Sequence, residues 1–434
     1  MLTVAYLANE FPSAVEPYVT EEIEELRGRG VHVITGSVRS PFQHEVAAAQ
    51  CMPEIVLRPP QARILVSAMA LSIRRWKCIW PLISRAAFQG GEGPLQRIKA
   101  LAHTWLGACY AVMLRGSGTK HIHVHHGYLG SWIAMVAARL LGINFSMTLH
   151  GSDLLLHPTY LDVKLKNCSF CLTVSEYNRN YILERYPRVQ AEKITVMHLG
   201  VEVPEFNTPV VAHPRRSPAF TILAVGRLHK VKDHALLVRA CAQLQTSGVP
   251  FQCLIAGGGP ERKRLESLIG ACGLQGRVTL LGHIARMEMN SWYEQADLVV
   301  LTSRSEGIPL VLMEAMARGK IVLAPDITGI PELVSAGKTG FLYAAGSLDD
   351  LVARLQSIYW LLETSDESGL RPSTVAGSKR LDLIRHSARA QVRNNFNRTK
   401  RLQAFGDFFL HQIAQRPESI PHEDPILQQI QLSV

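Results

Sequence analysis

Two glutamates eight positions apart mark the part of the sequence best suited to chemistry. Glu306 lies in a polar loop after the apolar residues 298–301, and Glu314 lies on a helix expected over residues 309–318. A carboxylate accepts two hydrogen bonds, which suits the hydroxyl groups of a sugar or a ribose. Gly307 allows a phosphate close to the backbone, and the free N–H groups of a helix N-terminus attract anions. The segment predicts a site for a ligand with phosphate and hydroxyl groups; a capped helix with two exposed acids is the alternative.

Two cations, Arg227 and Lys232, follow the strand expected over residues 220–225. Positive charge there could stabilise a diphosphate leaving group, whose negative charge grows in the transition state. Surface cations without a ligand are the alternative. Residues 256–262, AGGGPER, form a glycine-rich loop after the next expected strand, residues 251–256. The loop does not match G-x-G-x-x-G, so it does not indicate a dinucleotide fold.

Histidines are the candidate reactive residues of the first half of the chain. His150 ends the strand expected over residues 145–149, and Gly151 and Asp153 follow it. This position predicts that His150 faces a ligand cleft. A histidine at the edge of the core, satisfied by the backbone, is the alternative.

Three further histidines alternate along the expected strand 121–125 and therefore share one of its faces: His121, His123 and His125. Imidazoles in a row can bind zinc. No D-x-D type carboxylate pair stands out to hold a metal ion, so we expect no metal site. We expect His125 or His126 to line the ligand cleft instead.

The candidate residues follow strands in two series of alternating strands and helices. The first series has expected strands at residues 2–8, 31–36, 121–125, 145–149 and 168–174, and helices at 18–29, 131–141 and 176–184. The second has expected strands at residues 220–225, 251–256, 278–281, 298–301 and 321–324, and helices at 234–246, 261–272, 288–295 and 309–318. Such alternation is typical of parallel sheets with helices on both faces.

We therefore predict an α/β chain of two Rossmann-like domains, whose parallel sheets face each other across a ligand cleft. The predicted parts are a first domain (1–203), a polar linker with three prolines (204–217), a second domain (218–385), a helix that packs back toward the first domain (386–416) and a mobile tail (417–434).

The composition is that of a globular chain. With 434 residues, 47% hydrophobic and 19% charged, it can form two or three domains with their own cores. No apolar run is long enough to span a membrane, and the first residues lack the basic region of a signal peptide. The eight cysteines are then expected to be reduced. Cys168 and Cys171 are expected to be buried packing residues, because a structural zinc site needs about four ligands.

Positive charge is concentrated in residues 51–120, which hold ten Lys or Arg and two acids. Aromatic residues are interleaved with them: Trp76, Trp80, Phe88 and Trp105. This is typical of amphipathic helices on an anionic membrane surface. A solvated helix face near an anionic ligand is the alternative. No nucleic-acid recognition motif accompanies the charge, so we expect residues 58–120 to contact an anionic membrane and no nucleic acid.

Taken in order, the motifs of the second half resemble the retaining GT-B glycosyltransferases. Residues 303–319, SRSEGIPLVLMEAMARG, resemble the E-x7-E region of that family, and residues 324–341 resemble the segment after it. Residues 225–228, VGRL, with Lys232 resemble its G-R-L motif, although Asp233 stands where glycine is usual.

The first half resembles the exopolysaccharide branch of the family, which includes colanic acid and amylovoran glycosyltransferases. The segments that carry this likeness are 11–26, 121–125, 146–153 and 173–178. The family's double-glycine loop near the first strand is absent. The resemblance covers roughly residues 1–360 and the helical residues 387–410.

The resemblance implies a GT-B fold and an enzyme that moves a sugar from a nucleotide-sugar donor, with retention at the anomeric carbon. Catalytic roles fall to His150, Arg227, Lys232 and Glu306. Donor contacts fall to Gly226, Arg227, Lys232, Gly258, Arg262, His283, Ile284, Glu306, Gly307, Ile308, Pro309 and Glu314. Acceptor contacts fall to His125, His126 and Asp153. No metal or other cofactor is implied.

The implied acceptor is a glycan or a lipid-linked oligosaccharide in bacterial-type exopolysaccharide, capsule or lipopolysaccharide biosynthesis. We expect a cytoplasmic protein with peripheral contact to the inner face of the cytoplasmic membrane. A catalytically silent sugar-binding or scaffold subunit of a polysaccharide assembly complex is the alternative. The intact pairs Glu306 with Glu314 and Arg227 with Lys232 argue against it.

Overall fold

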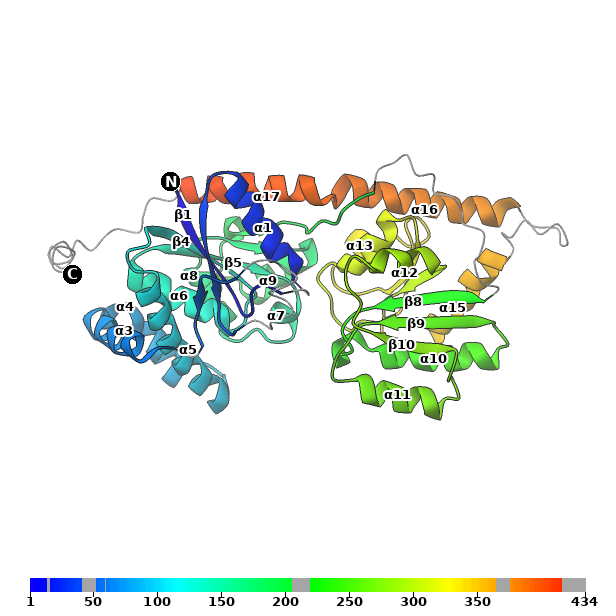
Figure 1. The fold of residues 1–434 in the computed structure, drawn as a ribbon, viewed down its shortest axis with the longest axis horizontal. Coiled ribbons are helices and arrows are strands. Elements are labelled where there is room, and N and C mark those ends of the chain that lie inside the picture. Colours follow the sequence, from blue (N-terminus) through cyan, green and yellow to red (C-terminus); the bar gives the residue numbers. More distant parts are fainter. Residues whose placement is uncertain (14–15, 41–51, 59, 205–218, 364–374, 416–434) are drawn as a thin grey trace. The chain divides into compact units, whose positions relative to one another are not determined.

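The computed structural model describes residues 1–13, 16–40, 52–58, 60–204, 219–363 and 375–415. The chain divides into two compact units, each with its own parallel sheet (Figure 1). Unit 1 comprises residues 1–174, 178–197 and those from 402 onward, and unit 2 comprises 175–177 and 198–401. The α/β prediction with two parallel sheets is confirmed. The predicted linker, apart from Pro204, and the predicted tail lie outside the described residues.

Unit 1 has a seven-stranded sheet with the order β3-β2-β1-β4-β5-β6-β7. The strands are β1 (Thr3–Ala8), β2 (His32–Ser37), β3 (Ile55–Val56), β4 (Thr119–His125), β5 (Asn144–Leu149), β6 (Cys171–Thr173) and β7 (Ile194–Val196). The helices are α1 (Pro17–Gly28), α3 (Ala62–Arg74), α4 (Trp76–Phe88), α5 (Pro94–Met113), α6 (Leu129–Leu141), α7 (Ser152–Leu155), α8 (Leu161–Asn167), most of α9 (Glu176–Arg185) and most of α17 (Arg398–Ala414).

The core of unit 1 has two layers because successive side chains of a strand point to opposite faces of the sheet. Ala5 and Leu7 of β1 lie in one apolar cluster with α5 and α6. Tyr6, between them, lies in a second cluster with α1 and α17. Phe409 of α17 packs edge-on against His123 at 5.3 Å between ring centroids. The end of α17 therefore covers the histidine-bearing face of the sheet.

Unit 2 has a six-stranded sheet with the order β10-β9-β8-β11-β12-β13. The strands are β8 (Phe220–Val225), β9 (Phe251–Ala256), β10 (Val278–Gly282), β11 (Leu298–Val300), β12 (Ile321–Pro325) and β13 (Phe341–Tyr343). The helices are α10 (His234–Thr246), α11 (Arg262–Ala271), α12 (Met289–Gln295), α13 (Leu310–Ala317), α14 (Ile330–Leu333), α15 (Leu348–Glu363) and α16 (Val375–Asn395). Every paired strand is parallel, so the loops that follow β8, β9 and β11 meet at one edge of the sheet.

Two helices, not one, occupy the predicted helix 386–416. The break falls at Phe396 and Asn397, between α16 and α17. Val201 donates a backbone hydrogen bond of 2.9 Å to Phe396 and accepts one of 2.9 Å from Arg398. The side chain of Asn397 accepts a hydrogen bond from the backbone N–H of Lys400. The backbone thus pairs with Val201 instead of continuing the helix, and Asn397 caps the next one.

The strand predicted over residues 168–174 is shorter than expected. Only Cys171–Thr173 pair as β6, because the N–H of Cys168 still bonds to the carbonyl of Lys164 at the end of α8. Cys168 and Cys171 are buried and neither is in a disulfide, as expected of packing residues. No helix among the described residues has the length and apolar character needed to cross a membrane.

Candidate functional site

Two strand-end loops of unit 2 bring Lys232 and Glu306 into direct contact. Lys232 ends a short 3-10 turn (Lys230–Lys232) after β8, and Glu306 lies in the loop between β11 and α13. The Lys232 ammonium donates a 2.5 Å hydrogen bond to the Glu306 carboxylate. The hydroxyl of Thr302 donates to the carbonyl of Lys232 at 2.9 Å, which joins the loops a second time. Two of the predicted catalytic residues are therefore neighbours.

Asp233 shows why this loop favours glycine. Its φ of 43° lies in the left-handed region, which side chains rarely adopt. Aspartate tolerates this conformation better than most residues. Its carboxylate also accepts a hydrogen bond of 2.8 Å from Arg304 of the Glu306 loop. The departure from the family pattern therefore preserves the backbone path and adds a contact.

The glycine run after β9 packs directly against the loop of Arg227. A side chain on Gly257 would place its Cβ 1.9 Å from the carbonyl oxygen of Gly226, and one on Gly259 would lie 2.5 Å from that of Leu228. Gly258, the glycine that the sequence singles out, would meet nothing within 4 Å. Gly257 and Gly259 therefore allow the close loop packing, and Gly258 faces open space.

The two arginines predicted at the donor differ in their surroundings. Arg227 is exposed, and within the described part of the chain its guanidinium has no partner. Arg262 is paired with Glu266, one turn along α11, at 2.8 Å. Arg227 is thus open to an anionic ligand, whereas Arg262 already has a counterion.

The residues after Glu306 differ in the backbone N–H groups that they offer to a phosphate. Gly307 and Ile308 have backbone N–H groups that no other described group uses. Pro309 has no N–H, so it cannot donate a hydrogen bond to a phosphate, and any other contact of Pro309 with the donor stays a prediction. Its carbonyl instead accepts bonds from Leu312 and Met313 and so begins α13.

Glu314 points into a cavity of 310 Å³ within unit 2. The hydroxyl of the buried Tyr293 donates to its carboxylate at 2.9 Å. Burial and then the nearby Glu314 raise the pKa of Tyr293. The lining combines acids, arginines and apolar side chains: Glu202, Arg286, Met287, Met289, Asn290, Tyr293, Glu314, Arg318 and Arg398. His283 and Ile284 precede Arg286 of the cavity lining in the sequence. His283 is exposed and Ile284 is half-buried.

His150 of unit 1 lies in an aromatic and imidazole pocket. Its ring stacks on Tyr18 at 4.5 Å between centroids and lies at the same distance from the ring of His126. Its Nε2 is 3.1 Å from Nδ1 of His125. Burial, and next the neighbouring imidazoles of His126, His125 and His123, lower the pKa of His150 well below its ordinary value. His150 is therefore uncharged at neutral pH.

Asp153 holds the loop that follows β5. It is fully buried, and its carboxylate accepts backbone N–H groups from Gly127 at 2.7 Å, His150 at 3.1 Å and Gly151 at 2.8 Å. These contacts give Asp153 a structural role beside His150. Its contact with an acceptor stays a prediction.

His125 ends β4 and His126 follows it; both are buried, but their partners differ. The side chain of His125 is completely buried. Its Nδ1 lies 3.1 Å from Nε2 of His150. His126 has a φ of 70°, and its Nε2 lies 2.9 Å from the Glu16 carboxylate. The predicted acceptor contact of either residue stays a prediction.

Two of the histidines on β4, His121 and His123, contact hydroxyls of the neighbouring strand β5. Both ring nitrogens of His123 are engaged, Nδ1 with Ser146 at 2.7 Å and Nε2 with Thr148 at 3.1 Å. His123 and His125 also come within 4.8 Å of the buried carboxylate of Glu22. A metal ion there would bind one ring nitrogen of His123 and would have to displace the hydroxyl that contacts it.

Sequence reasoning missed Lys164, Glu22 and Tyr18. Lys164 is fully buried and donates to the carbonyls of Gly127, Tyr128 and Thr159 at 2.7–2.9 Å; burial lowers its pKa to about 7. Tyr18 and Glu22 are one turn apart on α1, and that spacing is the signal that could have paired them.

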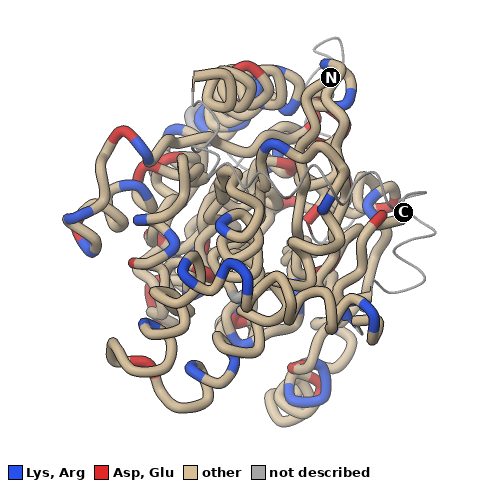
Figure 2. Tube along the Cα trace, turned by 90° about the vertical axis from the view of Figure 1, so that its left-hand side faces the viewer, with Lys and Arg blue, Asp and Glu red and all other residues tan. Residues whose placement is uncertain are grey.

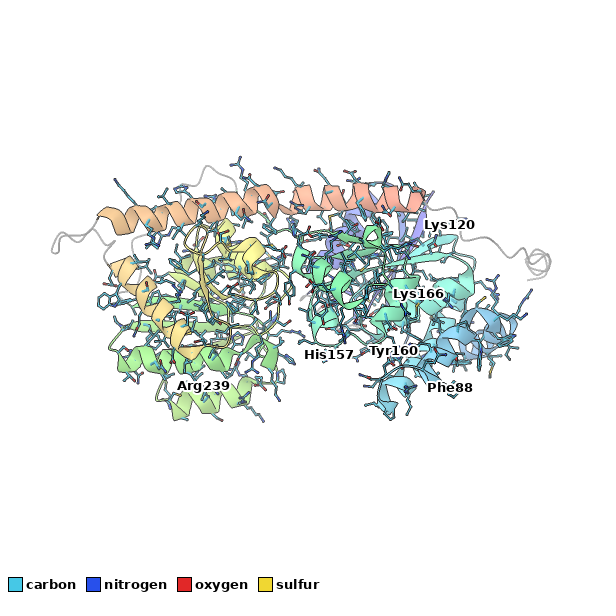
Figure 3. The ribbon with its side chains drawn as sticks, turned by 180° about the vertical axis from the view of Figure 1, so that it is seen from behind. Phe88, Lys120, His157, Tyr160, Lys166 and Arg239 are labelled. Atoms are coloured by element: carbon cyan, nitrogen blue, oxygen red, sulfur yellow. The ribbon has the colours of Figure 1, made fainter. Side chains whose placement is uncertain are left out.

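Helices α3, α4 and α5 expose apolar side chains beside exposed cations. Val66, Ile73, Trp76, Trp80, Phe88 and Ile98 are 48–75% exposed. Phe88 lies at the end of α4 (Figure 3). Arg63, Arg74, Lys77 and Lys99 are exposed on the same helices, and Figure 2 marks the cations on this end of the chain. We name these ten residues the basic apolar surface.

Other cations of this region serve the fold. Arg85 pairs with Glu92 at 2.8 Å, which holds its guanidinium on the protein. Arg97 donates to the carbonyls of Glu92 at 2.9 Å and Ala87 at 2.8 Å. Positive charge available to a partner is therefore smaller than the sequence count indicates.

Two family models match the chain in succession. Residues 15–205 match the model described as Glycosyltransferase Family 4, and residues 209–366 match the one described as Glycosyl transferases group 1. A putative colanic acid biosynthesis glycosyltransferase of Salmonella typhimurium is 36% identical over 170 residues, which is 38% of this chain and 41% of that protein. An amylovoran biosynthesis glycosyltransferase of Erwinia amylovora is 32% identical over 216 residues, 48% of each chain. The chain thus spans less than half the length of these relatives.

The fold has solved counterparts. The crystal structure of the Anabaena protein HepE in complex with UDP aligns with a TM-score of 0.66 and 18% identity. The alignment covers 95% of this chain and 100% of that one. At this identity the likeness concerns the fold: two parallel α/β units, as predicted.

Proposed function

The chain belongs to the group 1 glycosyltransferase family, and from that membership we propose that it transfers a sugar from a nucleotide-sugar donor. The proposed acceptor is a glycan or lipid-linked oligosaccharide, and the proposed setting is exopolysaccharide, capsule or lipopolysaccharide assembly. Its similarity to colanic acid and amylovoran glycosyltransferases supports that setting. The observation that carries the proposal is the contact of Lys232 with Glu306 at the edge of the unit 2 sheet.

The donor diphosphate is proposed to bind at this edge. Arg227 and Lys232 supply positive charge, and the free N–H groups of Gly307 and Ile308 supply hydrogen bonds. A diphosphate that takes Lys232 releases Glu306, whose carboxylate can then accept bonds from the hydroxyls of the donor sugar. Glu314, oriented by Tyr293, is proposed to hold the ribose.

The proposed reaction retains the configuration of the anomeric carbon. The bond from that carbon to the phosphate oxygen breaks, and the acceptor oxygen bonds to the same face. The leaving phosphate takes the proton of the acceptor hydroxyl. Lys232 and Arg227 stabilise the growing charge of the diphosphate, and the uncharged His150 aligns a sugar hydroxyl.

A thermal-shift screen with UDP-, GDP- and ADP-sugars tests donor use, because a ligand that binds the folded state raises the unfolding temperature. We expect a saturable shift with one nucleotide class, its loss in Lys232→Ala, and an altered shift in Glu306→Ala, which frees Lys232 for the diphosphate but removes the contact with the donor sugar. Lys230→Ala, an exposed cation of the same turn, is the matched control. Donor binding that neither site variant alters would contradict the site, and binding without transfer to any acceptor would favour the scaffold alternative.

The basic apolar surface is proposed to rest on an anionic membrane. Exposed aromatic and aliphatic side chains can enter the headgroup region while arginines and lysines meet its negative charge. Such contact would keep the enzyme at the surface that carries a lipid-linked acceptor.

A further inference from the structure

A buried carboxylate lies beside two buried histidines in unit 1. Glu22 of α1 is 5% exposed, and His123 and His125 of β4 are 0% and 1% exposed. The two histidines share one face of the strand because they are two positions apart. One ligand atom from each of the three side chains lies within 4.8 Å of the other two. We name these three residues the Glu22 site.

The nitrogen Nε2 of His125 has a close neighbour but no hydrogen bond. Oε2 of Glu22 is 3.1 Å away, yet this buried nitrogen has no hydrogen-bond partner among the residues that the structure describes. A metal ion shared by the two atoms explains both facts, because the nitrogen lone pair then points to the ion and the oxygen lies beside that axis. The distance agrees, since two ligand atoms of a tetrahedral zinc ion lie roughly 3.3 Å apart at bond lengths of about 2.0–2.1 Å.

The carboxylate of Glu22 has neutral neighbours. The hydroxyl of Tyr6 donates to it at 3.4 Å, and in the described part of the chain no lysine or arginine pairs with it. A buried charge is costly unless it is paired or coordinates a metal ion. A divalent cation between Glu22 and the histidines would supply the missing positive charge.

His123 can provide the third ligand at small cost. Its ring nitrogens contact the hydroxyls of Ser146 at 2.7 Å and Thr148 at 3.1 Å. An ion on one nitrogen removes only one of these contacts. If that contact is the one with Ser146, its hydroxyl keeps a partner, because it also lies 2.7 Å from Nε2 of His121. The hydroxyl contacts of His123 are therefore compatible with metal binding.

The other ring nitrogen of His125 is also engaged. A histidine that binds a metal ion through one nitrogen commonly uses the second in a hydrogen bond that fixes the ring. Here Nδ1 of His125 lies 3.1 Å from Nε2 of His150. The hydroxyl of Tyr6, 3.4 Å from Oε2 of Glu22, is available as a fourth oxygen.

We propose that Glu22, His123 and His125 bind one structural divalent metal ion, with zinc as the expected metal. Zinc accepts imidazole and carboxylate ligands together. Because all three side chains are buried, the ion would hold α1 on β4 and would not meet a substrate. The sequence predicts no metal site, since no carboxylate pair stands out near the histidines. Packing of α1 supplies the carboxylate, and His125 gains a role other than the predicted acceptor contact.

The metal content of the protein tests the site without any activity. The full chain, produced without a histidine tag in zinc-supplemented medium, should hold about one zinc ion by inductively coupled plasma mass spectrometry. Glu22→Gln and His125→Gln should lose it. Glu24→Gln and His32→Gln, changes at exposed positions of unit 1, are the matched controls and should keep it. Wild-type protein without stoichiometric metal would overturn the proposal, and so would zinc that Glu22→Gln retains.

Two measurements on the wild type decide the question even if the variants do not fold. Protein produced with cobalt in place of zinc should show the visible absorption of bound cobalt without the near-ultraviolet band of a cobalt–thiolate bond. A thiolate band would place the metal on cysteines and overturn the assignment. Protein refolded with zinc should have a higher Tm than protein refolded with a chelator, because an ion that binds only the folded state stabilises it. Equal Tm values would overturn the proposal.

Discussion

The ammonium of Lys232 and the carboxylate of Glu306 form a 2.5 Å hydrogen bond across two loops of one sheet edge. Their side chains are 21% and 12% exposed, so each charge is largely shielded by the other. An anionic ligand that approaches Lys232 competes with Glu306 for the same protons. The pair therefore links phosphate binding to the release of a carboxylate.

Opposite changes at this pair should have opposite effects on UDP affinity. Lys232→Met should weaken UDP binding about 10- to 100-fold, since a hydrogen bond to a charged group contributes about 1.5–3 kcal/mol. Glu306→Gln should leave UDP binding unchanged or tighter, because Lys232 loses its competitor, while sugar transfer falls. Isothermal titration calorimetry measures the UDP affinity of both variants. Equal weakening by the two variants would show that the pair acts only as a structural contact.

Stability should fall as the pH drops below about 6.5, the ordinary pKa of histidine. Burial, and then neighbouring histidines, lower the pKa values of His123 and His150 in the folded chain. Below about pH 6.5 the unfolded chain binds protons that the native chain rejects, so acid favours unfolding by up to about 1.4 kcal/mol per pH unit for each histidine.

Urea unfolding at about pH 7.5 and about pH 5.5 shows whether stability falls in acid, as predicted. The decrease in the free energy of unfolding between the two pH values should be smaller in His150→Gln than in the wild type. In His32→Gln, a change at an exposed histidine, it should equal that of the wild type. A stability that rises in acid would refute the assignment of both histidines as uncharged.

Gly257→Ala should disrupt the loop packing at the sheet edge. The new Cβ would lie 1.9 Å from the carbonyl oxygen of Gly226, and the φ of 147° is one that alanine rarely adopts. Strain of this kind costs about 1–3 kcal/mol before any clash is counted. Differential scanning calorimetry should show a clear drop in Tm, against little change for Gly258→Ala, whose Cβ meets nothing within 4 Å. Equal Tm values of the two variants would show that Gly257 is not required for the loop packing.

Membrane contact should depend on the basic apolar surface. The triple variant Trp76→Ser, Trp80→Ser, Phe88→Ser should lose co-sedimentation with vesicles of equal parts phosphatidylcholine and phosphatidylglycerol. Binding of the wild type should weaken with added salt, which screens the attraction between exposed charges. Trp360→Ser, at a tryptophan 57% exposed on unit 2, is the control. Wild-type protein that remains with the supernatant at low salt would exclude this surface as a membrane contact.

The local pattern of apolar and polar residues was enough to predict most strands of both sheets and many of the helices that pack on them. Apolar runs of strand length alternate with helical periodicity, and this depends on neighbours in sequence only. The break at Phe396 and Asn397 was not predictable in the same way. It depends on Val201, which lies nearly two hundred positions earlier and supplies the competing backbone partner.

The sequence by itself determined which residue types stand at the strand ends: Glu306, Lys232 and His150 each follow an apolar strand, where parallel sheets place their reactive groups. Tertiary structure decided what those residues touch. The β4–β5 register pairs His123 with Ser146. Packing of α1 on the sheet brings the Glu22 carboxylate to 3.1 Å from the ring of His125. The physical reason is that side-chain identity is local, whereas a hydrogen bond of about 3 Å requires two distant segments to be held in one register.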